Sequence, residues 1–179
     1  MYNLKGGYFM NLIPNMYKKN IYDINYEKLK LMGKKYLFFD LDNTIISYTD
    51  DDVNKEILGL FSNLQKMGFI CFIFSNSHSK RLMKVKDKLN IDVFHSSMKP
   101  LNKNYKKVVK MYDRDKCVFI GDQFMTDILG AKKNNLYIIL VDRIDSIEPL
   151  TTKFWRFFEN IILKKYKKEN KFIKGKYYE

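Results

Sequence analysis

Short apolar runs alternate along the chain with segments whose apolar residues recur at helical spacing. Uninterrupted apolar runs are typical of strands covered on both faces, and their alternation with helices predicts parallel βαβ units. We therefore expect an α/β fold with a central, mostly parallel sheet between layers of helices. The predicted strands span residues 35–40, 69–74, 93–94, 117–120 and 136–141, and the predicted helices span residues 26–32, 54–67, 81–89, 102–112 and 124–133. Residues 1–24 show no regular pattern, and Pro14 argues against a long helix there.

Reactive side chains stand at the points where these strands end. Asp40 ends one strand, Ser75 directly follows another, and Asp122 comes two residues after a third. Asp42 comes two residues after Asp40, and Lys99 follows the short strand at 93–94. The carboxyl ends of parallel strands lie side by side at one edge of a sheet, where α/β folds bind their ligands. The sequence therefore predicts that these five side chains share a pocket.

Each of these residues, taken alone, has a simpler explanation. A D-x-D sequence is most often a solvated turn, and a lone Ser or Lys is most often a helix cap or a surface side chain. A calcium-binding loop is excluded here, because Ile45 stands where that loop needs glycine. The repetition of the pattern at successive strand ends is what favours a catalytic site.

Four segments, in this order, resemble the motifs of the haloacid dehalogenase (HAD) superfamily. They are D-L-D-N-T at 40–44, S-N-S at 75–77, K-P at 99–100 and G-D-Q-F-M-T-D at 121–127. More narrowly, these segments resemble the subfamily IIIA phosphatases of the YqeG type, which are related to mitochondrial phosphatidylglycerophosphate phosphatases. The resemblance covers about residues 35–145 and implies a three-layer, Rossmann-like HAD core.

The resemblance also implies a role for each residue of the motifs. Asp40 would be the nucleophile that forms an aspartyl-phosphate, and Asp42 would protonate the leaving oxygen and then activate water. Ser75 would hydrogen-bond the phosphoryl oxygens, and Asn76 is a further candidate for the same contact. Lys99 would neutralise charge on both the phosphate and Asp40.

The metal implied by the resemblance is Mg²⁺, held by Asp40, Asp122 and Asp127 and by the backbone carbonyl of Asp42. Four carboxylates and one lysine leave the site with a formal charge of about −3 before an anionic substrate arrives. Each pair of like charges at contact costs ~4 kcal/mol at an effective dielectric constant of about 20. Charge counting therefore supports a divalent cation, and the all-oxygen donor set suits Mg²⁺.

The spacing of the motifs bears on the substrate. Only 32 residues separate Asp42 from Ser75 and 23 separate Ser75 from Lys99, and HAD cap domains are inserted at these two places. We therefore expect no cap domain and an open site, which suits a large substrate or one embedded in a surface.

The C-terminal part of the chain differs in composition from the rest, so we divide the chain into a phosphatase domain with an N-terminal extension at 1–150 and a basic amphipathic helix and tail at 151–179. This last part carries nine Lys and Arg against three Glu, a net charge of +6 out of +13 for the whole chain. In a helix at 152–165, one broad face holds Phe154, Phe157, Phe158, Ile161 and Ile162, with Trp155 at its edge and Lys153, Arg156 and Lys164 opposite. Such a helix either lies on an anionic membrane or packs onto the domain, and the sequence leaves both open. We expect residues 165–179 to be mobile.

The cysteines and the length of the apolar runs indicate where in the cell the protein is expected to reside. Cys71 and Cys117 lie within apolar runs, which predicts reduced core residues and a cytoplasmic protein, peripheral on the inner membrane face if the helix binds lipid. No apolar run approaches the ~20 residues that span a bilayer, and no secretion signal is expected.

The sequence supports three functional hypotheses. The preferred one is a Mg²⁺-dependent phosphatase acting on phosphatidylglycerophosphate or a similar anionic phospholipid. The second is a phosphatase for a soluble or protein phosphoester. The third is a basic nucleic-acid-binding module without catalysis, which the intact motifs argue against, because binding alone does not need this set of carboxylates.

Overall fold

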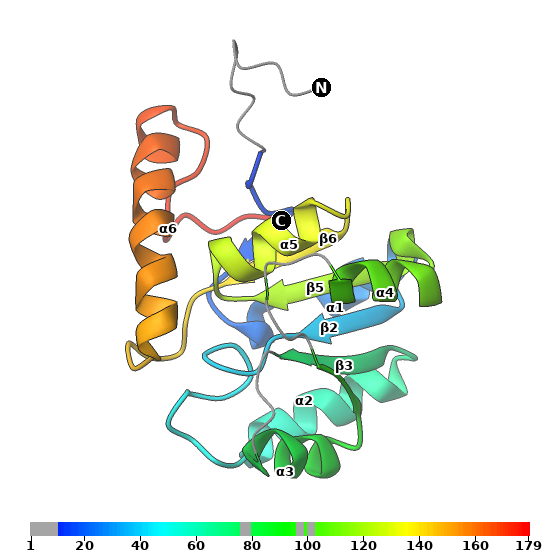
Figure 1. Ribbon diagram of the computed structural model, residues 1–179. Coiled ribbons are helices and arrows are strands. Elements are labelled where there is room, and N and C mark those ends of the chain that lie inside the picture. Colours follow the sequence, from blue (N-terminus) through cyan, green and yellow to red (C-terminus); the bar gives the residue numbers. More distant parts are fainter. Residues whose placement is uncertain (1–10, 76–79, 96–98, 100–102) are drawn as a thin grey trace.

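The computed structural model describes residues 11–75, 80–95, 99 and 103–179, and it places a parallel sheet at the centre of the molecule (Figure 1). The strand order is β1-β6-β5-β2-β3-β4, and each neighbouring pair is parallel. The strands are β1 (Met16–Lys18), β2 (Tyr36–Phe39), β3 (Ile70–Ser75), β4 (Asp92–His95), β5 (Cys117–Gly121) and β6 (Tyr137–Val141). The helices are α1 (Tyr26–Leu31), α2 (Lys55–Lys66), α3 (Lys80–Leu89), α4 (Lys103–Met111), α5 (Leu129–Lys132) and α6 (Leu150–Lys168).

Two hydrophobic cores lie on the two faces of the sheet, as alternation along buried strands requires. In β2, Leu37 and Phe39 belong to the core that includes apolar residues of α1, α2 and α3. Phe38 belongs to the other core, which includes residues of α4, α5 and α6, and its ring stacks between Phe72 and Phe119 at centroid distances of 4.9 and 4.7 Å. The predicted three-layer α/β core with a parallel sheet is therefore confirmed.

Local sequence explains where two of the predicted helices begin. The Asn25 side chain accepts a hydrogen bond from the backbone N–H of Lys28, and the Asn54 side chain accepts one from Ile57 at 2.8 Å. These contacts satisfy N–H groups that have no partner within the helix. The boundaries of α1 and α2 consequently agree closely with the sequence prediction.

The ends of the chain differ from the prediction. Residues 1–24 were expected to be irregular, but β1 forms an edge strand beside β6, and Ile21–Asp23 forms a short 3₁₀ helix. The expectation of a mobile segment at 165–179 is wrong, because Tyr178 exchanges two backbone hydrogen bonds with Tyr17, and Phe172 is buried. A three-residue strand and an irregular tail have no periodicity, so only their long-range contacts reveal them.

The two candidate positions for a cap domain hold ordinary elements of the core. Between Asp42 and Ser75 the chain forms α2 and enters β3, and the described residues between Ser75 and Lys99 form α3 and β4. No inserted domain occurs in the described residues of these two segments.

Cys71 and Cys117 are buried free thiols, as predicted, and burial raises the pKa of each to about 12.

Candidate active site

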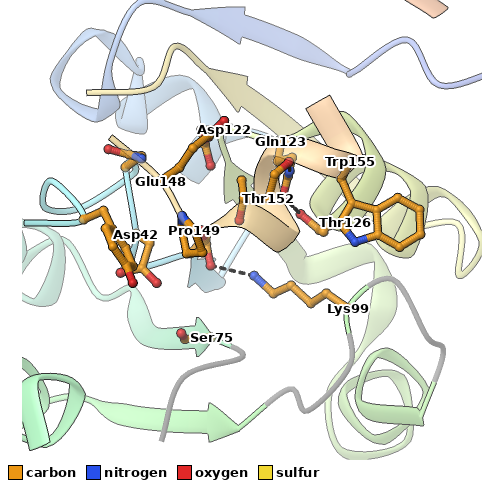
Figure 2. Close-up of a pocket in the computed structure, with 13 residues that line it drawn as sticks. Asp42, Ser75, Lys99, Asp122, Gln123, Thr126, Glu148, Pro149, Thr152 and Trp155 are labelled. Atoms are coloured by element: carbon orange, nitrogen blue, oxygen red, sulfur yellow. Dashed lines mark hydrogen bonds and ion pairs between the residues drawn. The ribbon is translucent and has the colours of Figure 1, made fainter. Parts of the chain in front are cut away.

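A cavity of about 350 Å³ opens at the carboxyl ends of β2, β3 and β5 (Figure 2). Five of the predicted site residues line it: Asp40, Asp42, Ser75, Lys99 and Asp122. Figure 2 labels four of them, Asp42, Ser75, Lys99 and Asp122, around one hollow, together with Glu148, Thr152 and Trp155 from the segment that leads into and through α6. The convergence predicted from the strand ends is therefore present in the structure.

Lys99 joins two of the carboxylates at the base of the site. Its Nζ donates to Asp40 Oδ1 at 2.7 Å and to Asp127 Oδ1 at 2.9 Å, and the lysine side chain is almost fully buried. Burial lowers the pKa of Lys99, but the carboxylates of Asp127 and Asp40 outweigh this effect and leave the pKa above its ordinary value. Lys99 is therefore a charged ammonium held against the candidate nucleophile.

Three carboxylates form a candidate metal centre. Asp40, Asp122 and Asp127 each offer an oxygen atom, and these atoms all lie within 4.8 Å of one another. Burial raises the pKa of Asp40 to about 7 against the effect of Lys99, and it raises the pKa of Asp122 to about 6 against the effect of Arg156. A divalent cation would favour the charged form of both groups, and a site built from carboxylate oxygens suits a hard ion such as Mg²⁺.

Gly121 allows the third carboxylate to come this close. A Cβ atom added at Gly121 would lie 2.5 Å from Cγ of Asp127, so any larger residue would displace that side chain. Asp127 is oriented further by the backbone N–H of Gln123, which donates to Oδ2 at 3.2 Å. Asp127 lies within a π-helical turn, Phe124–Ile128, which begins directly after Gln123; such turns are frequent at functional sites. Gly121 is thus explained by the close packing of Asp127, and Asp122 by its place in the carboxylate cluster.

Arg81 is a site residue that the sequence analysis missed. It comes from the first turn of α3, and its guanidinium forms an ion pair with Oδ1 of Asp42. The same group donates to the backbone carbonyls of Ser47, Tyr48 and Asp50 at 2.7–3.1 Å. Arg81 therefore holds the loop after β2 in place and sets the position of Asp42.

Arg156 is a second missed residue. The sequence placed it on the polar face of the C-terminal helix, but its side chain is only 11% exposed and pairs with Oδ2 of Asp122. It also donates to the carbonyl of Asp122 at 3.0 Å, to Glu159 at 3.1 Å and to Glu148 at 3.2 Å. The Glu159 carboxylate in turn accepts from the backbone N–H of Phe124 at 3.2 Å. These contacts fasten α6 to the segment that carries two of the candidate metal ligands.

Three predicted site residues remain to be placed: Asp127, Asn76 and Asp42. Asp127 lies next to Asp40 and Lys99 and completes the carboxylate cluster. Asn76 lies outside the described residues, so its proposed contact with phosphate stays a prediction. Asp42 is not part of the carboxylate cluster, and its role as a metal ligand through the backbone carbonyl also stays a prediction.

A family comparison decides what kind of protein carries this site. The profile of the haloacid dehalogenase-like hydrolases matches residues 21–135, which span the whole set of site motifs. The chain belongs to the haloacid dehalogenase-like hydrolase family. The resemblance read from the four motifs is thereby confirmed, and so is the prediction that the protein is an enzyme of the HAD phosphatase type.

Two individual proteins are similar to this chain, one in sequence and one in fold. The chain is 31% identical over 159 residues to the "Probable phosphatase YqeG" of Bacillus subtilis, and the match covers 88% of this chain and 92% of the relative. The solved structure of a predicted HAD-like family hydrolase from Porphyromonas gingivalis superposes with a TM-score of 0.50 at 12% identity, over 69% of this chain and 98% of that one. The second likeness supports the fold alone.

Within the described residues, no helix combines the length and the apolar character needed to cross a bilayer.

Proposed function

We propose that this HAD hydrolase is a Mg²⁺-dependent phosphomonoester hydrolase that works through an aspartyl-phosphate. The observation that carries the proposal is the position of Asp40, at the end of β2 in an open cavity and 2.7 Å from the buried Lys99 ammonium. Asp122 and Asp127 complete the carboxylate cluster beside it. A nucleophile, a fixed cation and a set of metal ligands thus lie within one small volume.

The reaction of these residues has two steps. In the first, an Asp40 oxygen attacks phosphorus, the ester P–O bond breaks, and Asp42 gives its proton to the leaving oxygen. In the second, water attacks the same phosphorus, Asp42 takes a proton from that water, and the bond to Asp40 breaks to release phosphate. Lys99 neutralises negative charge in both steps. Bound Mg²⁺ would supply further positive charge at the phosphoryl group.

The substrate that we propose is phosphatidylglycerophosphate or a similar anionic phospholipid. The described residues around the site contain no inserted cap, so a phosphate attached to a large molecule can enter the cavity. One wall of the cavity carries Trp155 of α6, a side chain with a large apolar surface. The motif resemblance to lipid phosphatases supports the same substrate class.

The test is phosphate release by the purified protein from lipid phosphates in mixed micelles and from soluble phosphomonoesters, each with and without Mg²⁺. We expect hydrolysis that needs Mg²⁺, that prefers the lipid phosphate and that is lost in Asp40→Asn. Asp51→Asn, an exposed carboxylate in the loop after the nucleophile, is the matched control and should leave the rate unchanged.

Each outcome of this test is informative. Activity that survives in Asp40→Asn would overturn the aspartyl-phosphate mechanism. Preference for a soluble or protein phosphoester would keep the mechanism and overturn the lipid substrate. Absence of any hydrolysis, together with salt-dependent nucleic-acid binding that Asp40→Asn does not affect, would support a binding module instead.

A further inference from the structure

Helix α6 has two apolar sides, and only one of them packs on the domain. Ile162, Leu163 and Tyr166 contact the core on the α4–α5 face of the sheet. On the other side, Phe154 and Phe157 are 60% and 62% exposed, and Phe158 and Ile161 are exposed as well. We call these four exposed side chains the aromatic ridge. The sequence leaves open whether the broad apolar face of this helix packs onto the domain; in the structure Ile162 of that face packs on the core, whereas the four residues of the ridge stay exposed.

The aromatic ridge is continuous and reaches the mouth of the active site. The Phe158 ring lies 5.2 Å from Phe154 and 5.6 Å from Phe157, measured between centroids, so the rings contact one another rather than the core. Phe154 also lies 5.8 Å from the ring of Trp155, which lines the catalytic cavity. Contiguous exposed apolar surface in a soluble domain marks a site of interaction, because exposing it to water is unfavourable.

Lysines accompany the aromatic ridge along α6. At 3.6 residues per turn, Lys153 and Lys164 lie beside the ridge rather than opposite it as the sequence analysis placed them, and Lys168 follows about two turns after Ile161; all three are exposed. Residues 151–179 as a whole carry a net charge of +6. Exposed Phe and Ile side chains flanked by lysines are the composition of helices that lie in the interface of an anionic bilayer.

We propose that α6 is a membrane-docking element: the aromatic ridge inserts into the interfacial region of a bilayer rich in anionic phospholipid, and the flanking lysines contact the lipid phosphates. Docking through this ridge brings the mouth of the cavity against the lipid headgroups, because Trp155, whose ring lies against Phe154 of the ridge, lines the cavity. The purpose of this placement rests on the proposed lipid substrate, but the docking itself does not depend on catalysis.

A second copy of the chain fits the aromatic ridge less well. Stable protein interfaces bury about 20–30 residues on each partner, whereas the ridge consists of four side chains. A two-fold pairing of α6 helices would also bring the lysine-rich flanks of both copies together, and like charges disfavour that contact. An anionic surface offers the opposite charge to the same lysines.

The experiment is flotation of the full chain with vesicles of phosphatidylcholine alone and with vesicles that also contain phosphatidylglycerol. Three proteins are compared: wild type, a ridge variant with Phe154→Ser, Phe157→Ser and Ile161→Ser, and a matched control with Leu31→Ser and Met111→Ser. Leu31 and Met111 are exposed apolar residues outside α6, so the control removes apolar surface elsewhere. We expect wild type and control to float with phosphatidylglycerol vesicles, and the ridge variant to bind at least about tenfold more weakly.

Charge is tested in the same assay. Lys153→Gln, Lys164→Gln and Lys168→Gln together should weaken flotation and its dependence on salt, whereas Lys30→Gln, Lys106→Gln and Lys110→Gln, which remove exposed lysines elsewhere, should not. Trp155 is the single tryptophan of the chain, so a blue shift of its emission on adding anionic vesicles reports the same event at the mouth of the cavity.

The outcomes separate docking from catalysis. Hydrolysis of a soluble phosphomonoester should be equal in wild type and the ridge variant, which also shows that the variant is folded. Failure of wild type to float, or equal flotation of the ridge variant, overturns the docking proposal even if the enzyme is active. A ridge-dependent dimer in sedimentation experiments without lipid overturns it in favour of a second copy. Normal flotation of a protein without any phosphatase activity supports docking and overturns the proposed function alone.

Discussion

Arg156 provides the sharpest test of how the C-terminal helix supports the site. Its guanidinium pairs with three buried carboxylates, those of Asp122, Glu148 and Glu159. The substitution Arg156→Met keeps most of the apolar stem of the side chain and removes only the charged group. The three carboxylates would then remain buried near one another without their shared cation.

The expected cost follows from this burial. Removal of one partner from a buried ion pair destabilises a protein by about 3–5 kcal/mol, because the remaining charge is left without compensation. For a chain of this size, each kcal/mol lowers the melting temperature by roughly 2–4 °C, so we expect a fall of about 6–20 °C. Added Mg²⁺ should recover part of this loss, since a cation at Asp122 would replace some of the missing charge.

Urea unfolding of wild type and Arg156→Met, with and without Mg²⁺, measures the effect. Lys153→Met is the matched control, because Lys153 is exposed on the same helix, and it should change the free energy of unfolding by less than about 0.5 kcal/mol. Adding Glu159→Gln to Arg156→Met should restore some stability, since it removes one uncompensated carboxylate. A loss of less than about 1 kcal/mol in Arg156→Met would refute the reasoning.

Three further predictions concern the site itself. Burial raises the pKa of Asp40 from its ordinary 3.8 to about 7, so the folded protein binds this proton more tightly than the unfolded chain. The stability that this group contributes without metal is therefore complete below pH 3.8 and is lost as the pH rises through about 7, and thermal melts at pH 4–8 should show a smaller decline in Asp40→Asn. Gly121→Ala should displace Asp127, cost about 1–3 kcal/mol in thermal unfolding and lower kcat more than tenfold, and unchanged activity would contradict the close approach. Arg81→Met should lower kcat at least tenfold without changing the Mg²⁺ concentration that gives half-maximal activity, because Arg81 contacts Asp42 and not the carboxylate cluster; a Mg²⁺ titration of the rate checks this.

Several features of this protein could be read directly from the order of its residues. Buried strands carry their apolar residues in one run, so β2, β3, β5 and β6 are visible without a structure. The carboxyl ends of parallel strands always meet at one edge of the sheet, and for that reason Asp40, Ser75 and Asp122 could be placed together in advance. The caps at Asn25 and Asn54 are likewise local, since each side chain bonds a backbone group three residues away.

The tertiary structure alone decided which side chains hold that site in place. Arg81 reaches Asp42 across 39 positions of the chain, and Arg156 reaches Asp122 across 34. A lone arginine on a helix has no local signal for such a contact, because its partner depends on how two elements pack rather than on spacing within one. The same reason explains why the pairing of Tyr17 with Tyr178 was missed, and why only the packing of α6 revealed which of its two apolar sides stays in water.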